Sequence, residues 1–90
     1  MTFLVDVVRL SPGERDQIYE QLAAVSFMTN LYAPKGTMKG LVVFWDERLQ
    51  PQTFISIVDL FPMCRHADIT GWDLEDMDYV FSYAFGSGDG

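Results

Sequence analysis

Basic side chains are scarce in this 90-residue chain. Six Lys and Arg residues stand against 13 Asp and Glu residues, which gives a net charge of -7. A negative chain repels nucleic-acid phosphates, and no stretch of the sequence forms a basic stripe that would bind them. We therefore predict no direct binding to nucleic acid. The same charge favours attraction to the basic surface of a partner protein.

Cysteine and long apolar runs are scarce as well. Cys64 is the single cysteine, so an internal disulfide is excluded and a reducing compartment is favoured. No apolar run approaches the roughly 18 residues that a membrane helix needs. The amino-terminal stretch lacks a basic start and carries Asp6 among its apolar residues, unlike a signal peptide. We predict a cytoplasmic protein without a membrane segment.

The length and composition indicate one globular domain. Ninety residues leave no room for two domains, and the apolar fraction of 49% is typical of a chain with a core. We assign residues 1–86 to a single α+β domain. The glycine-rich residues 87–90 are predicted to be a flexible tail.

The rest of the chain is organised around an apolar run that begins at Gly40 and ends before Asp46. This run is short and rich in β-branched and aromatic residues, which indicates a buried strand over about 38–46. An earlier strand over 27–33 and turn-forming residues at 34–36 complete a predicted β-hairpin. A further strand is predicted over 2–10.

Two helices are predicted between these strands. Ser11 and Glu14 have the spacing of a capping box, and with Pro12 they predict a helix over 12–25. A second helix is predicted to begin at Pro51 and to end at Pro62. Its residues 53–57 are rich in β-branched side chains that also suit a strand. Apolar residues at helical spacing favour the helix: Phe54, Ile57, Val58 and Phe61.

Large aromatic residues alternate with smaller ones over 79–85, which predicts a final strand. A further short strand is predicted over 67–74. The order β-α-β-β-α-β is that of the ferredoxin-like split βαβ sandwich, in which two helices cover one face of an antiparallel sheet and the other face is open. Two alternatives remain for the aromatic row. It faces the helices as core, or it faces outward and needs a partner or a second copy.

The residues that could carry chemistry form no specific motif. Cys64 and His66 are the candidates for a nucleophile and a base, but no third residue is evident that would orient the imidazole. A calcium loop beginning at Asp73 needs glycine at its sixth position and glutamate at its twelfth, which Asp78 and Ala84 occupy. We therefore predict a protein that is not an enzyme and has no metal site and no cofactor.

Charge is distributed unevenly along the chain. After Arg65 there is no Lys or Arg, whereas six acidic residues follow it, with Trp72 and Tyr79 among them. Such acids would steer a basic partner, and the aromatic residues would supply buried anchors. The alternative is a polar surface that only keeps the protein in solution. The predicted partner-binding residues are Asp68, Trp72, Asp73, Glu75, Asp76, Asp78 and Tyr79.

These observations favour a non-enzymatic inhibitor or decoy that occupies a basic surface of a partner protein, one that ordinarily holds nucleic acid. In size and charge the chain is similar to small acidic phage proteins that inhibit host defence, such as anti-CRISPR proteins. The alternative is a ferredoxin-like homodimer that serves as a small-ligand or regulatory module through its open sheet face. A small enzyme that uses His66 with a carboxylate fits the sequence less well than either.

Overall fold

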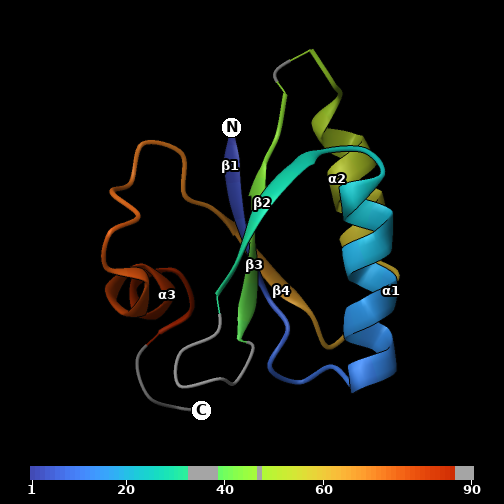
Figure 1. The fold of residues 1–90 in the computed structure, drawn as a ribbon, viewed down its shortest axis with the longest axis horizontal. Helices are drawn as coiled ribbons and strands as arrows, with labels where there is room; N and C mark the ends of the chain where they lie inside the picture. The colour runs from blue at the N-terminus through green and yellow to red at the C-terminus, as the bar shows by residue number, and fades with distance from the viewer. Residues whose placement is uncertain (33–38, 47, 87–90) are drawn as a thin grey trace.

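The computed structural model describes residues 1–32, 39–46 and 48–86, with backbone alone over 27–32. The predicted turn at 34–36 and the predicted tail at 87–90 lie outside the described residues. The helices and strands follow one another in Figure 1 as β1 (Thr2–Asp6), α1 (Pro12–Ala23), β2 (Phe27–Tyr32), β3 (Gly40–Phe44), α2 (Pro51–Val58), β4 (Arg65–Asp68) and α3 (Met77–Phe85).

The strands form one sheet in the order β2-β3-β1-β4, and every neighbouring pair is antiparallel. At the centre of the sheet, Leu4 of β1 lies opposite Val42 of β3 and Ala67 of β4. Strands β2 and β3 pair as the predicted hairpin, with Tyr32 opposite Gly40. The chain therefore has the predicted α+β fold.

Helices α1 and α2 lie together on one face of the sheet (Figure 1). The predicted capping box begins α1, because the Ser11 hydroxyl accepts from the Glu14 N–H at 3.2 Å and the Glu14 carboxylate accepts from the Ser11 N–H at 3.1 Å. In α2, Phe54 is fully buried and its ring stacks on that of Phe3, with 4.1 Å between ring centroids. Both predicted helices are confirmed, and both end a few residues earlier than expected.

Residues 79–85, predicted as the final strand, instead belong to helix α3. The Asp76 carboxylate caps this helix by accepting from the Tyr79 N–H at 3.1 Å, and Gly86 ends it with a φ of 85°. The prediction was wrong because the aromatic alternation hides a helical pattern. The apolar residues that face the sheet follow helical spacing: Met77, Val80, Phe81, Ala84 and Phe85.

The fourth strand of the sheet is β4, which overlaps the start of the extra strand predicted over 67–74. Residues 69–74 do not continue that strand. They form the connection to α3, and the Trp72 N–H donates to the Ile69 carbonyl at 3.1 Å within a turn. One strand and one helix therefore take the places of the two strands predicted after Pro62.

Helix α3 covers the sheet face opposite α1 and α2 (Figure 1), so the prediction of an open face is wrong. Leu4, Val42, Ile69 and Val80 form the buried centre of this second layer. The physical reason lies in β1 and β3, whose buried apolar residues point to both faces of the sheet. Phe3 and Val5 pack on one face, and Leu4 and Val42 pack on the other. A strand with two apolar faces needs a cover on each face.

An ion pair between the buried Asp6 carboxylate and the partly exposed Arg65 side chain connects the sheet to the end of α3. Asp6 is 2% exposed, and the Arg65 guanidinium donates to its Oδ2 from Nε at 2.8 Å and from Nη2 at 2.5 Å. The same guanidinium donates to the Phe85 carbonyl at 3.2 Å, and the Val8 N–H donates to Asp6 Oδ1 at 3.0 Å. Arg65 thus links β1, β4 and α3, and it neutralises the buried carboxylate.

We expect Arg65→Ala to lower the free energy of unfolding by about 2–4 kcal/mol, because it leaves Asp6 buried without its cation. Arg48→Ala is the matched control, since Arg48 pairs with Asp46 at the surface and its side chain is 88% exposed. Urea denaturation followed by circular dichroism measures both variants. Equal losses in the two variants would contradict the structural role given to Arg65.

Gly40 supports a close approach of two strands. A Cβ at this position would lie 2.8 Å from the Val5 carbonyl oxygen, which is backbone and cannot move aside without shifting β1. We expect Gly40→Ala to cost about 1–3 kcal/mol of unfolding free energy. Gly13→Ala, where nothing lies within 4 Å of the added Cβ, should be neutral or stabilising in the same urea titration. A neutral Gly40→Ala variant would show that β1 and β3 are not packed this closely.

Candidate functional site

Three aromatic rings gather on the solvent side of α3. Trp72 lies between the other two, with its ring centroid 3.9 Å from that of Tyr83 and 6.0 Å from that of Tyr79. The two tyrosines are four residues apart on the helix and therefore share a face. Their exposed fractions are 59% for Tyr79 and 62% for Tyr83, although large side chains are usually more buried.

The fold explains why these rings are outside. The apolar face of α3 is used against the sheet, so its tyrosines are left on the opposite side. Trp72 is half-buried and packs against the second core layer, which anchors it. The turn that delivers Trp72 uses Gly71 at a φ of 87°, a left-handed conformation that glycine adopts without strain.

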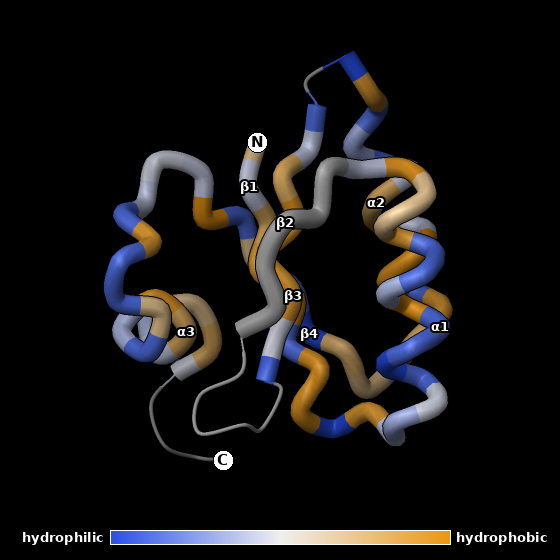
Figure 2. Tube along the Cα trace, viewed as in Figure 1, coloured by the Kyte–Doolittle hydropathy of each residue, from blue (hydrophilic) through white to orange (hydrophobic). Residues whose placement is uncertain are grey.

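Acidic residues lie close to Trp72 and Tyr79 in the sequence, in the segment that leads into α3, where the tube in Figure 2 is blue with a short orange interruption. Asp73, Glu75, Asp76 and Asp78 are all exposed. Asp73 Oδ1 accepts from the Glu75 N–H at 3.0 Å, and Asp76 caps the helix. The aromatic–acidic surface is defined here as Trp72, Asp73, Glu75, Asp76, Asp78, Tyr79 and Tyr83.

No described cation neutralises these carboxylates. The ion pairs within residues 1–32, 39–46 and 48–86 join Arg48 to Asp46 and Arg65 to Asp6. Arg65, the last cation of the sequence, is therefore held by the core and not by the acids that follow it. The aromatic–acidic surface keeps its negative charge available to a partner.

Asp68 does not join the aromatic–acidic surface, although the sequence analysis grouped it there. It lies opposite Phe3 in the pairing of β1 with β4, and Phe3 belongs to the core beneath α1 and α2. Residues directly opposite in an antiparallel pair point to the same side of the sheet. The Asp68 carboxylate accepts from the Thr70 hydroxyl at 2.5 Å and from the Thr70 N–H at 2.8 Å, and these hydrogen bonds lower the pKa of Asp68.

Tyr83 is the member of the surface that the sequence analysis missed. It was placed in a strand with three other aromatic residues, where its side would depend on the face of the sheet. The spacing of Tyr79 and Tyr83 by four residues, together with Asp76 as a helix cap, is the signal that could have identified it.

Cys64 and His66 contact different groups in the described structure, and the Cys64 thiol donates to the Arg65 carbonyl at 3.7 Å. Burial, together with the nearby charge of Asp6, raises the pKa of Cys64 to about 12, so its thiol is protonated at neutral pH. His66 packs edge-on against the Phe54 ring, with 5.5 Å between centroids. Among the described residues, no cluster of three or more His, Cys, Asp or Glu side chains could hold a metal ion.

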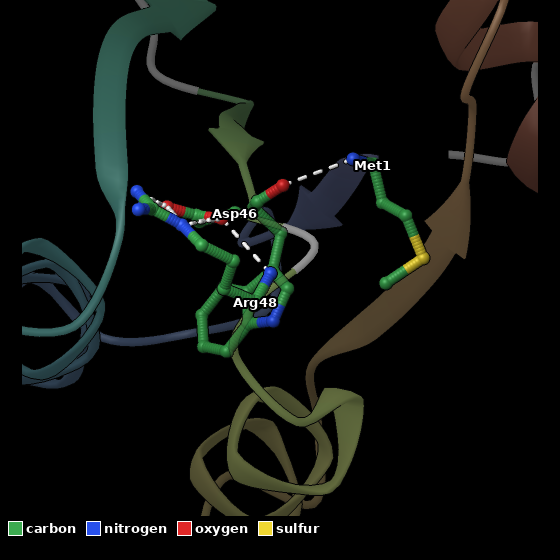
Figure 3. A network of polar contacts seen from close by, with 4 residues as sticks. Met1, Asp46 and Arg48 are labelled. Carbon is green, nitrogen blue, oxygen red and sulfur yellow. Dashed lines mark hydrogen bonds and ion pairs between the residues drawn. The ribbon is translucent and has the colours of Figure 1, made fainter.

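An open cleft lies between the end of α1 and the start of α2, but its charged groups satisfy one another. Arg48 donates to the Asp46 carboxylate from Nη2 at 2.6 Å and from Nε at 3.1 Å (Figure 3). The hydrogen bond from the Arg48 side chain, followed by that from its backbone N–H, lowers the pKa of Asp46 to about 2. The Met1 amine in Figure 3 donates to the Trp45 carbonyl at 2.9 Å, outside the pair. Among the described residues that line the cleft, no unpaired charge is therefore left to orient a ligand.

No family model, curated protein or solved structure matches the chain. None of the helices in the described residues is long and apolar enough to cross a bilayer. The candidate site therefore rests on the geometry of the aromatic–acidic surface alone.

We expect the Cys64 thiol to react slowly with an aromatic disulfide reagent at pH 8 in the native protein. A pKa of about 12 leaves roughly a thousandth of the thiolate that an unperturbed cysteine would have. Absorbance of the released thiol measures the rate, and the same protein in urea is the control. Equal rates in the two states would contradict the burial of Cys64.

Proposed function

We propose that this chain is a non-enzymatic protein-binding inhibitor or decoy that acts in the cytoplasm. It occupies a basic surface of a partner protein, one that ordinarily holds nucleic acid. The observation that carries the proposal is the aromatic–acidic surface, in which three clustered rings lie among four exposed carboxylates without a described cation.

The two kinds of side chain supply different parts of binding. Aromatic residues are frequent binding hot spots because they bury a large area with few rotatable bonds. Carboxylates around them raise the association rate with a basic partner and disfavour acidic competitors. Trp72 holds both tyrosines within ring contact, which lowers the entropy lost when a partner covers them.

The amount of negative charge favours a local docking patch over a protein whose whole surface mimics the phosphates of DNA. Charged residues make up 21% of the chain, a little below the usual quarter, so the excess of acid arises from the scarcity of Lys and Arg. By analogy of size and charge alone, the proposal extends to phage proteins that inhibit host defence, including anti-CRISPR proteins.

We also assign the connectivity of β1 to β4 to the ferredoxin-like class, with α3 as an addition to it. The antiparallel order β2-β3-β1-β4, with one helix in each crossover, supports this assignment. A dimeric module that uses an open sheet face is not proposed, because α3 lies on that face.

The proposal is tested by competition. Labelled DNA or RNA is bound to each member of a panel of purified proteins with basic nucleic-acid clefts, and fluorescence anisotropy follows its release by the chain. We expect release from at least one protein, with an effect that weakens as salt rises. The test variant combines Asp73→Asn, Glu75→Gln and Asp78→Asn, and it leaves the helix cap at Asp76 intact.

The control variant combines Asp16→Asn, Glu20→Gln and Asp59→Asn, which removes the same charge from exposed positions on and next to α1 and α2. We expect the test variant to lose about tenfold or more in apparent affinity and the control to keep the wild-type value. No release from any panel member, or equal losses in the two variants, would contradict the proposed function.

A further inference from the structure

Helix α3 carries aromatic rings on the side that faces the sheet and on the side that faces solvent. Lys or Arg side chains contact the rings on the sheet side. On the sheet side, Lys39 Nζ lies 5.8 Å from the centre of the Phe81 ring, and the Arg65 guanidinium carbon lies 5.1 Å from that of Phe85. These distances are within the range in which a cation is attracted to a ring face. The chain thus covers its inner rings with its own Lys and Arg.

The outer rings have no such cover within the described residues. Neither cation–ring contact there involves Trp72, Tyr79 or Tyr83. More than half of each tyrosine is exposed, and the charges placed nearby by the sequence are carboxylates. The negative faces of the rings and the carboxylates therefore favour the same kind of ligand group, a cation.

We propose that this surface binds an arginine side chain of the partner, whose guanidinium lies flat on the Tyr83 ring. This inference rests on the proposed function and names the group that the partner supplies. Tyr83 is the more exposed of the two tyrosines, and its contact with Trp72 at 3.9 Å fixes the ring. A fixed ring loses little freedom when a ligand stacks on it.

Asp76 adds a carboxylate just before α3, on the side of the helix that carries the two tyrosines. It precedes Tyr79 by three residues and Tyr83 by seven, so all three lie along one face of α3. Its Oδ1 is oriented by the Tyr79 N–H at 3.1 Å. The Asp76 carboxylate therefore adds negative charge to the side of the helix that carries the rings, and this charge favours a cationic ligand group there.

Arginine fits this arrangement better than lysine. The guanidinium is planar, weakly hydrated and able to stack while it donates several hydrogen bonds in its own plane. An ammonium is a compact, strongly hydrated charge that gains less from an exposed ring. Arginine is also the residue with which proteins most often contact phosphates and guanine, so a nucleic-acid-binding surface supplies it.

The test compares two labelled peptides of equal length and charge, one an arginine–glycine repeat and the other a lysine–glycine repeat. Fluorescence anisotropy at low salt measures their binding to the full chain. We expect the arginine peptide to bind about three- to tenfold more tightly. Tyr83→Leu should remove this preference, and Tyr83→Phe should retain it because phenylalanine keeps the ring.

Tyr19→Leu is the matched control, since Tyr19 is an exposed tyrosine on α1, away from this surface. It should leave the arginine preference unchanged, and circular dichroism verifies that each variant is folded. Equal, salt-sensitive binding of the two peptides would overturn the arginine site and leave the acidic docking surface in place. A preference that persists in Tyr83→Leu would overturn the assignment to that ring.

Discussion

The structure depends on the apolar character of β1 and β3 on both of their faces. Phe3 and Val5 belong to the core beneath α1 and α2, whereas Leu4 between them belongs to the core beneath α3. A sheet of this kind cannot leave either face in water without exposing large apolar side chains. Helix α3 is the second cover, and its amphipathic character decides which aromatic rings remain in solvent.

The pair of Asp6 and Arg65 connects this constraint to the surface charge. A carboxylate within the sheet requires a cation and hydrogen bonds, and Arg65 supplies both while it also contacts the carbonyl and ring of Phe85. The last cation of the chain is thereby used inside the fold, where it links the end of α3 to the strands. Asp73, Glu75, Asp76 and Asp78 consequently have no ion-pair partner among the described residues.

Local signals in the sequence were sufficient to predict the first five elements, β1 to α2, and most of their bounds. The capping box at Ser11, the prolines at the first position of α1 and α2 and the apolar run of β3 each act over a few residues. Helix α3 was missed because four aromatic residues alternate over 79–85, while the smaller Val80 and Ala84 supply the helical face. Asp68 was misgrouped because its side of the sheet depends on the β1–β4 register, which adjacency in the sequence does not determine.

One signal for α3 was available in the opening run of β3. Leu41, Val42 and Val43 are apolar in succession, which is typical of a strand covered on both faces and conflicts with an open sheet face. If residues 77–85 are assigned to a covering helix, Tyr83 lies one turn after Tyr79 and joins the same exposed face.

The most direct test of this account is nuclear magnetic resonance of the isotopically labelled chain in solution. Cα and Cβ chemical shifts over 77–85, with nuclear Overhauser contacts from the Val80 methyl groups, report both the conformation and the packing of this segment. The account predicts helical shifts and contacts from Val80 to Leu4 or Val42. Extended shifts over 77–85, or a Val80 without contacts to the sheet, would contradict it.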